Sequence, residues 1–130
     1  MTKIELDFSK LVLNVKGESI PDMLDVPDGT DSKLCPNLSI GSLIAHALTL
    51  AIRCNPKEAR RYHEIAFNIE LALKNNSGKM EVSEGEISQI EEGLNKMSNP
   101  MFQTVVYSGA MQEFLDDAKT MIQTSKKGSV

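Results

Sequence analysis

Four amphipathic segments follow one another between residues 39 and 124, and they constrain the fold more than any other feature of the sequence. In the first segment, apolar residues recur between residues 40 and 51 at i, i+3, i+4, i+7, i+8 and i+11, which is the period of an α-helix. Each segment begins at a residue that favours a helix N-cap, namely Ser39, Asn55, Ser83 and Asn99. The sequence therefore predicts four helices, of which the first, apolar on several sides, is the central one.

Local residues support these helix starts. Pro56 and Pro100 directly follow two of the caps, at the first helical position where proline is favoured. Glu58 stands three residues after Asn55, and Glu86 completes a capping box with Ser83. The last helix is predicted to bury an apolar stripe made of Phe102, Val105, Val106, Ala110, Met111, Phe114, Leu115, Ala118, Met121 and Ile122. Gly109, inside this helix, is expected to mark a kink or a close helix crossing.

The first 20 residues have a different pattern. Residues 3–8 alternate apolar and polar side chains, which is typical of a half-buried strand. Residues 11–15 form a second apolar run, a turn pattern follows at 16–19, and Ile20 can begin a return strand. We predict a β-hairpin around Gly17 that packs on the helices, because an isolated hairpin is only marginally stable.

Residues 21–37 contain three prolines and four aspartates, which predicts an acidic loop. The aspartates lack the spacing of a calcium-binding loop. The fold class is therefore mainly α (α+β), a single domain over residues 1–130 with a β-hairpin (1–20), the acidic loop, a compact bundle of about four helices (38–124) and a flexible tail (125–130).

Charge is unevenly distributed along a chain whose formal net charge is −4. Residues 39–80 carry six basic groups against three acids, whereas residues 81–98 carry one lysine against five glutamates. These opposite segments can meet inside one molecule, meet between copies, or stay solvated. The acidic balance disfavours a protein that coats nucleic acid.

The two cysteines, Cys35 and Cys54, do not form a disulfide framework, so we expect a reducing compartment. The N-terminus lacks the apolar core of a signal peptide, and no run approaches 18 apolar residues. We therefore expect a cytoplasmic protein without a membrane span.

Catalytic patterns are weak. His63-Glu64 resembles the start of a zinc-protease helix, but Phe67 stands where the second histidine is needed. Geometry allows a zinc site made of His46, His63 and one cysteine, although no ligand spacing supports it. No serine or cysteine has a neighbouring base, and no phosphate-binding GK[ST] motif occurs. We therefore expect no enzymatic activity, no metal and no cofactor.

The second helix contains the best candidate for a binding site. Its candidate partner-binding residues are Arg53, Lys57, Arg60, Arg61 and His63. The alternative is a solvated helix face whose charges pair with Glu58 and Glu64. Because the chain has no Trp and an acidic helix follows, a protein partner is favoured over DNA.

The order of these segments resembles a group of small proteins encoded by tailed bacteriophages and prophages. The resemblance rests on KIELDFSKLVLNVKGESI at the N-terminus, LSIGSL at 38–43, ARRYHEIAFNIELAL at 59–73, EVS at 81–83 and the helix from Pro100 to Leu115. It covers about residues 3–117, and the loop at 21–37 is longer than the group's pattern. The resemblance implies a phage or prophage origin and supplies no catalytic residue.

Together these features predict a non-enzymatic phage-type protein that acts through protein–protein interaction. We expect a virion assembly accessory or a chaperone-like factor, in the host cytoplasm or associated with the virion, that binds a phage structural protein or a host protein. The alternatives are an intracellular regulator that binds a host or phage protein, for example in transcription, and a nucleic-acid-binding module. Self-association into a homo-oligomer is also open.

Overall fold

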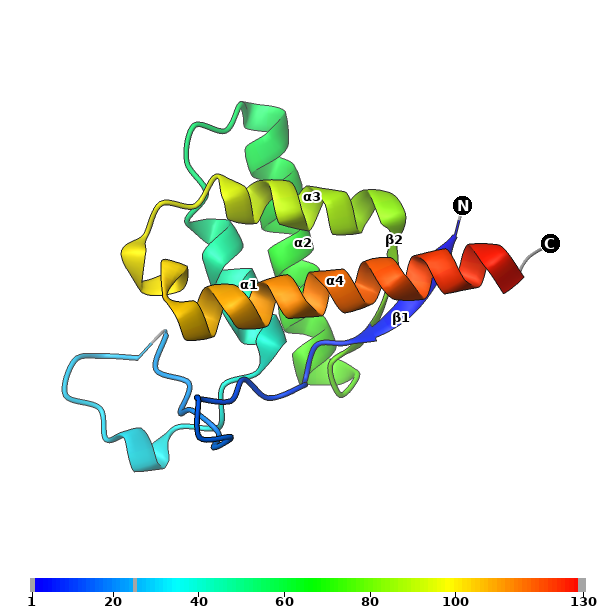
Figure 1. Ribbon diagram of the computed structural model, residues 1–130. Coiled ribbons are helices and arrows are strands. Elements are labelled where there is room, and N and C mark those ends of the chain that lie inside the picture. Colours follow the sequence, from blue (N-terminus) through cyan, green and yellow to red (C-terminus); the bar gives the residue numbers. More distant parts are fainter. Residues whose placement is uncertain (1, 25, 129–130) are drawn as a thin grey trace.

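The computed structural model describes residues 2–24 and 26–128, and it contains four α-helices, two β-strands and two short 3₁₀ helices (Figure 1). The elements in chain order are β1 (Lys3–Asp7), η1 (Ser32–Leu34), α1 (Ile40–Thr49), α2 (Pro56–Asn75), β2 (Lys79–Ser83), α3 (Glu84–Asn95), η2 (Pro100–Gln103) and α4 (Val105–Gly128). The predicted fold class, mainly helical with a small antiparallel β element, is confirmed.

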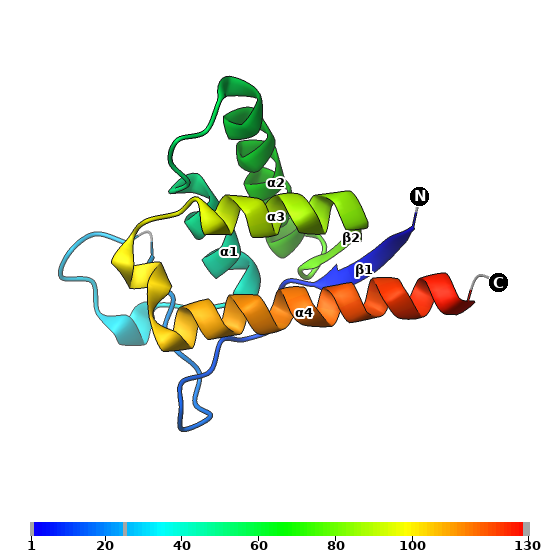
Figure 2. The ribbon, with the colours of Figure 1, turned by 45° about the horizontal axis from the view of Figure 1, so that its top comes forward.

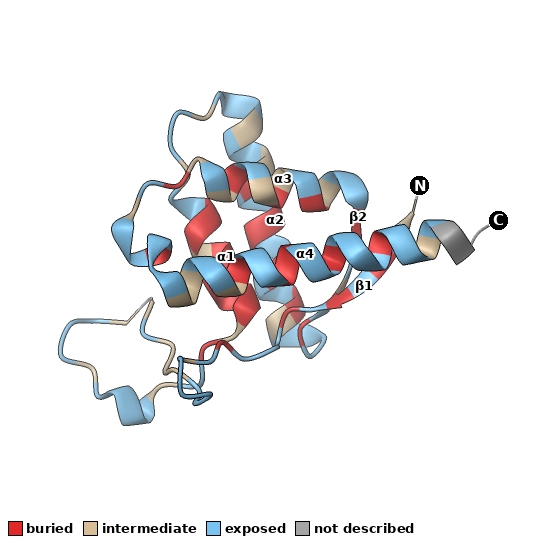
Figure 3. Ribbon diagram, in the orientation of Figure 1, coloured by how far each residue is buried: buried red, intermediate tan, exposed pale blue. Residues whose placement is uncertain are grey.

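The helices form two layers. In both views α3 and α4 run side by side in opposite directions and cross the layer formed by α1 and α2 (Figures 1 and 2). The predicted central position of α1 is confirmed, because every one of its residues from Ile40 to Leu48 is buried except His46. Buried residues accordingly concentrate where the two layers meet (Figure 3).

Three of the four predicted helix caps form as expected, and the fourth, Asn99, does not start α4. The Ser39 side chain accepts a hydrogen bond from the backbone N–H of Ser42, and Asn55 and Ser83 each belong to a complete capping box. Asn99 caps η2, a single 3₁₀ turn that precedes α4. These contacts satisfy N–H groups that a helix start leaves without a partner, which is why short sequence motifs locate the helix starts well.

The strand at residues 3–7 is confirmed, but its partner differs from the predicted hairpin. β1 pairs antiparallel with β2, from Lys3 opposite Ser83 to Asp7 opposite Lys79. The turn at Gly17 does form, with a φ of 80°, yet it is closed by a single bridge between Leu13 and Ser19. Val82 of β2 is buried and lies opposite β1. The two strands are about 80 positions apart in the sequence, so no local sequence pattern can reveal this contact.

The acidic segment 21–37 leaves the core through a closed neck. Pro21 and Asn37 form a bridge, and the N–H of Asp22 donates to the carbonyl of Pro36 at 2.7 Å. Beyond the neck the segment carries η1, whose N-cap is Asp31. The segment is thus tied to the body of the protein at both of its ends; Asp25 lies outside the described residues.

The C-terminal helix differs from the prediction at two positions of its apolar stripe. Val105 is 87% exposed and Met121 is also exposed, whereas the other predicted stripe residues Met111, Phe114, Leu115, Ala118 and Ile122 are buried as expected. Gly109 marks no close crossing, since a Cβ built there has no atom within 4 Å. α4 also continues to Gly128, past the expected start of a flexible tail at residue 125; residues 129 and 130 lie outside the described part.

Candidate functional site

The segment before α2 holds an arginine in an unusual conformation. Arg53 has a φ of 59°, a left-handed backbone conformation that costs a non-glycine residue about 1–2 kcal/mol. The neighbouring N–H of Ile52 donates to the carbonyl of Lys96 at 3.0 Å, which fixes this linker against the end of α3. The exposed Arg53 side chain has no hydrogen bond or ion pair to any described residue.

The structure separates the five predicted binding residues into two groups. Arg53, Lys57, Arg60 and His63 are all exposed at the start of α2 or just before it. Arg61 instead turns toward α3, where its Nε donates to Gln89 Oε1 at 2.7 Å, and its Nη1 lies 3.7 Å from Glu64. Arg61 therefore holds α2 against α3 and is the least available of the five.

Two exposed apolar residues on the same helix were not predicted from the sequence. Phe67 is 56% exposed and Leu71 is 40% exposed, and they are one turn apart. With Arg60, His63 and Lys74 they are spaced by three or four residues, so all five share the side of α2 that faces away from the core. Phe67 and Leu71 do not belong to the buried stripe of α2, and this departure from the helical period could have identified them as exposed. The stripe consists of Tyr62, Ile65, Ala66, Ile69 and Ala72.

We call these five side chains, together with Lys57 and Arg53 at the N-terminal end, the α2 face. From Arg60 to Lys74 it is about 21 Å long at 1.5 Å per residue. Cations stand at both ends and the two apolar side chains lie between them. The N-terminal end is made more positive by the dipole of α2 itself.

A surface hollow of about 290 Å³ adjoins the α2 face where α1 packs on α2. Both histidines of the chain line it, His46 from α1 and His63 from α2, together with Phe67 and Glu70. Neither cysteine lines this hollow, so the hypothetical zinc ligands are not brought together. Within the described residues, no three His, Cys, Asp or Glu side chains are placed to hold a metal ion.

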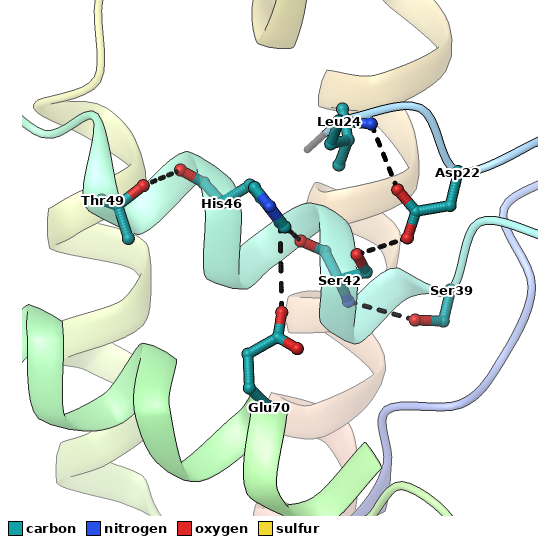
Figure 4. A network of polar contacts seen from close by, with 7 residues as sticks. All are labelled: Asp22, Leu24, Ser39, Ser42, His46, Thr49 and Glu70. Atoms are coloured by element: carbon teal, nitrogen blue, oxygen red, sulfur yellow. Dashed lines mark hydrogen bonds and ion pairs between the residues drawn. The ribbon is translucent and has the colours of Figure 1, made fainter. Parts of the chain in front are cut away.

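A polar network connects this hollow to the acidic segment (Figure 4). His46 Nδ1 lies 2.8 Å from the carbonyl oxygen of Ser42 and 4.0 Å from Glu70 Oε1. The buried Ser42 hydroxyl donates to Asp22 Oδ2 at 2.7 Å. The serine hydroxyl is thus bonded to a carboxylate, and the histidine contacts the serine backbone, so this trio lacks the serine–histidine bond of a hydrolase.

The other side of α2 is held by an ion pair. The Lys96 ammonium binds Glu58 and lies 5.7 Å from the centre of the Tyr62 ring. The hydrogen bond from Lys96, and then the N–H of Asn55, lower the pKa of Glu58 below its usual value of 4.5. The same bond from Glu58 raises the pKa of Lys96. Glu58 therefore pairs away from the α2 face and does not neutralise it.

This pair predicts a pH dependence of stability. Because the pKa of Glu58 is lower in the folded chain, its contribution is present above pH 4.5 and is lost as the pH falls through the folded-state pKa. The raised pKa of Lys96 puts the other limit above pH 10.5, where its contribution is lost as the pH rises. Urea unfolding should show a smaller acid loss of stability in Glu58→Gln, which keeps the side-chain oxygen of the capping box, than in the unaltered chain.

The double variant Glu58→Gln/Lys96→Met is the control for this prediction. In a Lys96→Met background, the change at Glu58 should have much less effect on the acid slope, because the main cause of the lowered pKa is gone. Equal slopes in the unaltered chain and in Glu58→Gln would show that the ion pair does not contribute.

A larger hollow, of about 340 Å³, lies between residues 10–15 and the first half of α4. Its described lining is mainly apolar, with Lys10 and Glu113 as its charged residues. None of the predicted binding residues lines it. The α2 face and this hollow are therefore separate surfaces.

No family model matches this chain, and no curated protein and no solved structure matches it either. Over the residues that the structure describes, no helix combines the length and the apolar character needed to cross a membrane. The function must therefore be argued from the surface of the molecule.

Proposed function

We propose that this chain is a non-enzymatic protein-binding module whose partner docks on the α2 face. The observation that carries the proposal is the exposed pair Phe67 and Leu71, flanked by cations that have no counter-charge inside the described fold. Aromatic and arginine side chains are the residues most often responsible for affinity in protein interfaces. A surface of this composition fits a partner that presents apolar side chains beside acidic ones.

The composition of the α2 face favours a protein over nucleic acid. Glu64 and Glu70 are exposed beside Phe67, where they would repel phosphate groups. Proteins that bind single-stranded nucleic acid usually offer several aromatic side chains on which successive bases stack. On α2, Phe67 is the one exposed aromatic side chain. A protein partner uses the apolar centre and the cationic ends together.

We further propose that the partner is a phage structural protein and that the chain acts as an assembly accessory or chaperone-like factor in the host cell. This part of the proposal is supported by the resemblance of the sequence to small proteins of tailed phages. A rigid helical body that presents one amphipathic helix face is suited to hold a partner without chemistry on it.

The test compares two baits in lysate from phage-infected cells. The α2 variant, Arg60→Glu/Phe67→Ala, should capture its partner about thirtyfold less strongly than the unaltered chain, because truncation of an aromatic anchor typically costs about 2 kcal/mol. The matched control Lys16→Glu/Met121→Ala changes one exposed cation and one exposed apolar residue elsewhere on the surface. It should capture the partner as well as the unaltered chain does.

Identification of the captured proteins by mass spectrometry distinguishes the assembly role from the regulatory role. A capsid or tail protein that the α2 variant alone fails to bind would support the assembly role. A host protein lost in the same way, and present also in uninfected lysate, would replace assembly by regulation. Equal capture by all three baits would overturn the proposed binding surface.

A further inference from the structure

The acidic helix α3, which the sequence suggested as the counterpart of the basic segment, is largely neutralised inside the molecule. Glu91 lies 2.5 Å from Lys119 and Glu84 lies 2.6 Å from Lys126, both across to α4. Glu92 lies 3.5 Å from Lys96 at the end of its own helix. Three of the four glutamates of α3 are thus in ion pairs within the molecule, and the fourth, Glu86, belongs to the capping box with Ser83.

The acidic segment 21–37 keeps its charge. Its sequence has four aspartates against Lys33, and no described residue of this segment forms an ion pair. Asp28 and Asp31 are exposed beyond the closed neck, and Leu34 beside them is 81% exposed. The segment therefore combines negative charge with an exposed apolar side chain, which is the complement of the α2 face.

These two complementary surfaces form no ion pair with each other within the described part of one molecule. In Figure 1 the segment projects at the lower left of the protein, whereas α2 begins at its top. The neck holds it there through the bridge between Pro21 and Asn37 and through the bond from Ser42 to Asp22.

We infer that the 21–37 segment of one copy binds the α2 face of a second copy, head to tail. Leu34 would pack against Phe67 and Leu71, while Asp28 and Asp31 would lie near Arg60 and Lys57. The inference rests on the proposed function, because it uses the same α2 face and adds a second copy of the chain as a further occupant of it. Since the two surfaces differ, a pair of copies keeps one segment and one α2 face free, and the contact builds open chains or closed rings.

The charge in this contact makes it sensitive to salt. Exposed ion pairs are screened at high ionic strength, so self-association of the purified full-length chain should weaken as salt is added. Sedimentation velocity over a range of protein concentrations measures this directly. We expect species larger than a monomer at low salt and a shift toward monomer at high salt.

Two variants test the two surfaces separately. One is the α2 variant, and the other is the segment variant Asp28→Lys/Leu34→Ser, whose changed side chains make no contact within the described fold that folding would need. Each variant alone should self-associate about tenfold less strongly or worse than the unaltered chain. An equimolar mixture should form a 1:1 dimer that grows no further, because each variant contributes one intact surface.

The outcomes separate this inference from the proposed function. A purified chain that stays monomeric at all concentrations at low salt, or a mixture that stays monomeric, overturns the head-to-tail contact. Self-association that survives in both variants also overturns it, because another surface is then responsible. In each of these cases the proposed function stands if the α2 variant still fails to capture the lysate partner. Conversely, head-to-tail assembly with equal capture by all baits supports the inference and confines the α2 face to self-association.

Discussion

Replacing Phe8 by alanine is expected to lower the free energy of unfolding by about 3–5 kcal/mol. Phe8 follows β1, is completely buried, and packs its ring 5.1 Å from that of Phe114 on α4. Its backbone carbonyl also accepts a hydrogen bond from the N–H of Gly41 at the start of α1. Residue 8 thus joins the strand, the central helix and α4, and removal of its ring leaves a cavity in a closely packed core.

Phe67→Ala is the matched control, since it removes the same side chain from an exposed position. We expect it to change stability by about 0.5 kcal/mol or less. Urea unfolding monitored by circular dichroism measures both variants, and Phe8→Leu, with a smaller expected loss, provides a value if Phe8→Ala does not fold. Similar losses for Phe8→Ala and Phe67→Ala would contradict the packing described here.

Gly78→Ala is expected to destabilise the fold by about 2–5 kcal/mol. Gly78 ends the turn between α2 and β2 with a φ of 82°, a conformation that costs an alanine about 1–2 kcal/mol. A Cβ there would also lie 2.6 Å from the backbone nitrogen of Ser9, and overpacking of this kind adds about 1–3 kcal/mol. Because the close atoms include backbone, the contact cannot be relieved by a side-chain rotation.

Gly29→Ala separates the two causes. Gly29 has a φ of 87°, but a Cβ built on it meets no atom within 4 Å. It should therefore show the conformational cost alone, about 1–2 kcal/mol. If thermal or urea unfolding gave equal losses for Gly29→Ala and Gly78→Ala, the close approach of residue 78 to Ser9 would not be important for stability.

The candidate site was only partly predictable. The cations of α2 are visible in the sequence because they cluster within ten residues, and four of the five predicted side chains are accessible. The sequence could not show that Arg61 is held by Gln89 on a different helix. Phe67 and Leu71 were not predicted as part of the site, because another element can cover an apolar residue that lies outside the buried stripe of its helix. Only the packed structure shows that no element covers these two side chains.

Features that depend on neighbours a few residues apart were determined by the sequence itself. The caps at Ser39, Asn55 and Ser83 act on N–H groups within three positions, and the helical period places the stripe of α2 from its own residues. Helix starts, the central role of α1 and the mainly helical class therefore followed from local chemistry.

Tertiary structure alone decided which distant segments meet. β1 pairs with β2 because both must cover the same apolar layer, although an adjacent hairpin is the nearer partner in the sequence. In the same way, Glu84 and Glu91 of α3 pair with lysines of α4, while the described aspartates of 21–37 form no ion pair within the described fold. Charge pairs and strand pairs depend on distance in space, and sequence separation does not encode that distance.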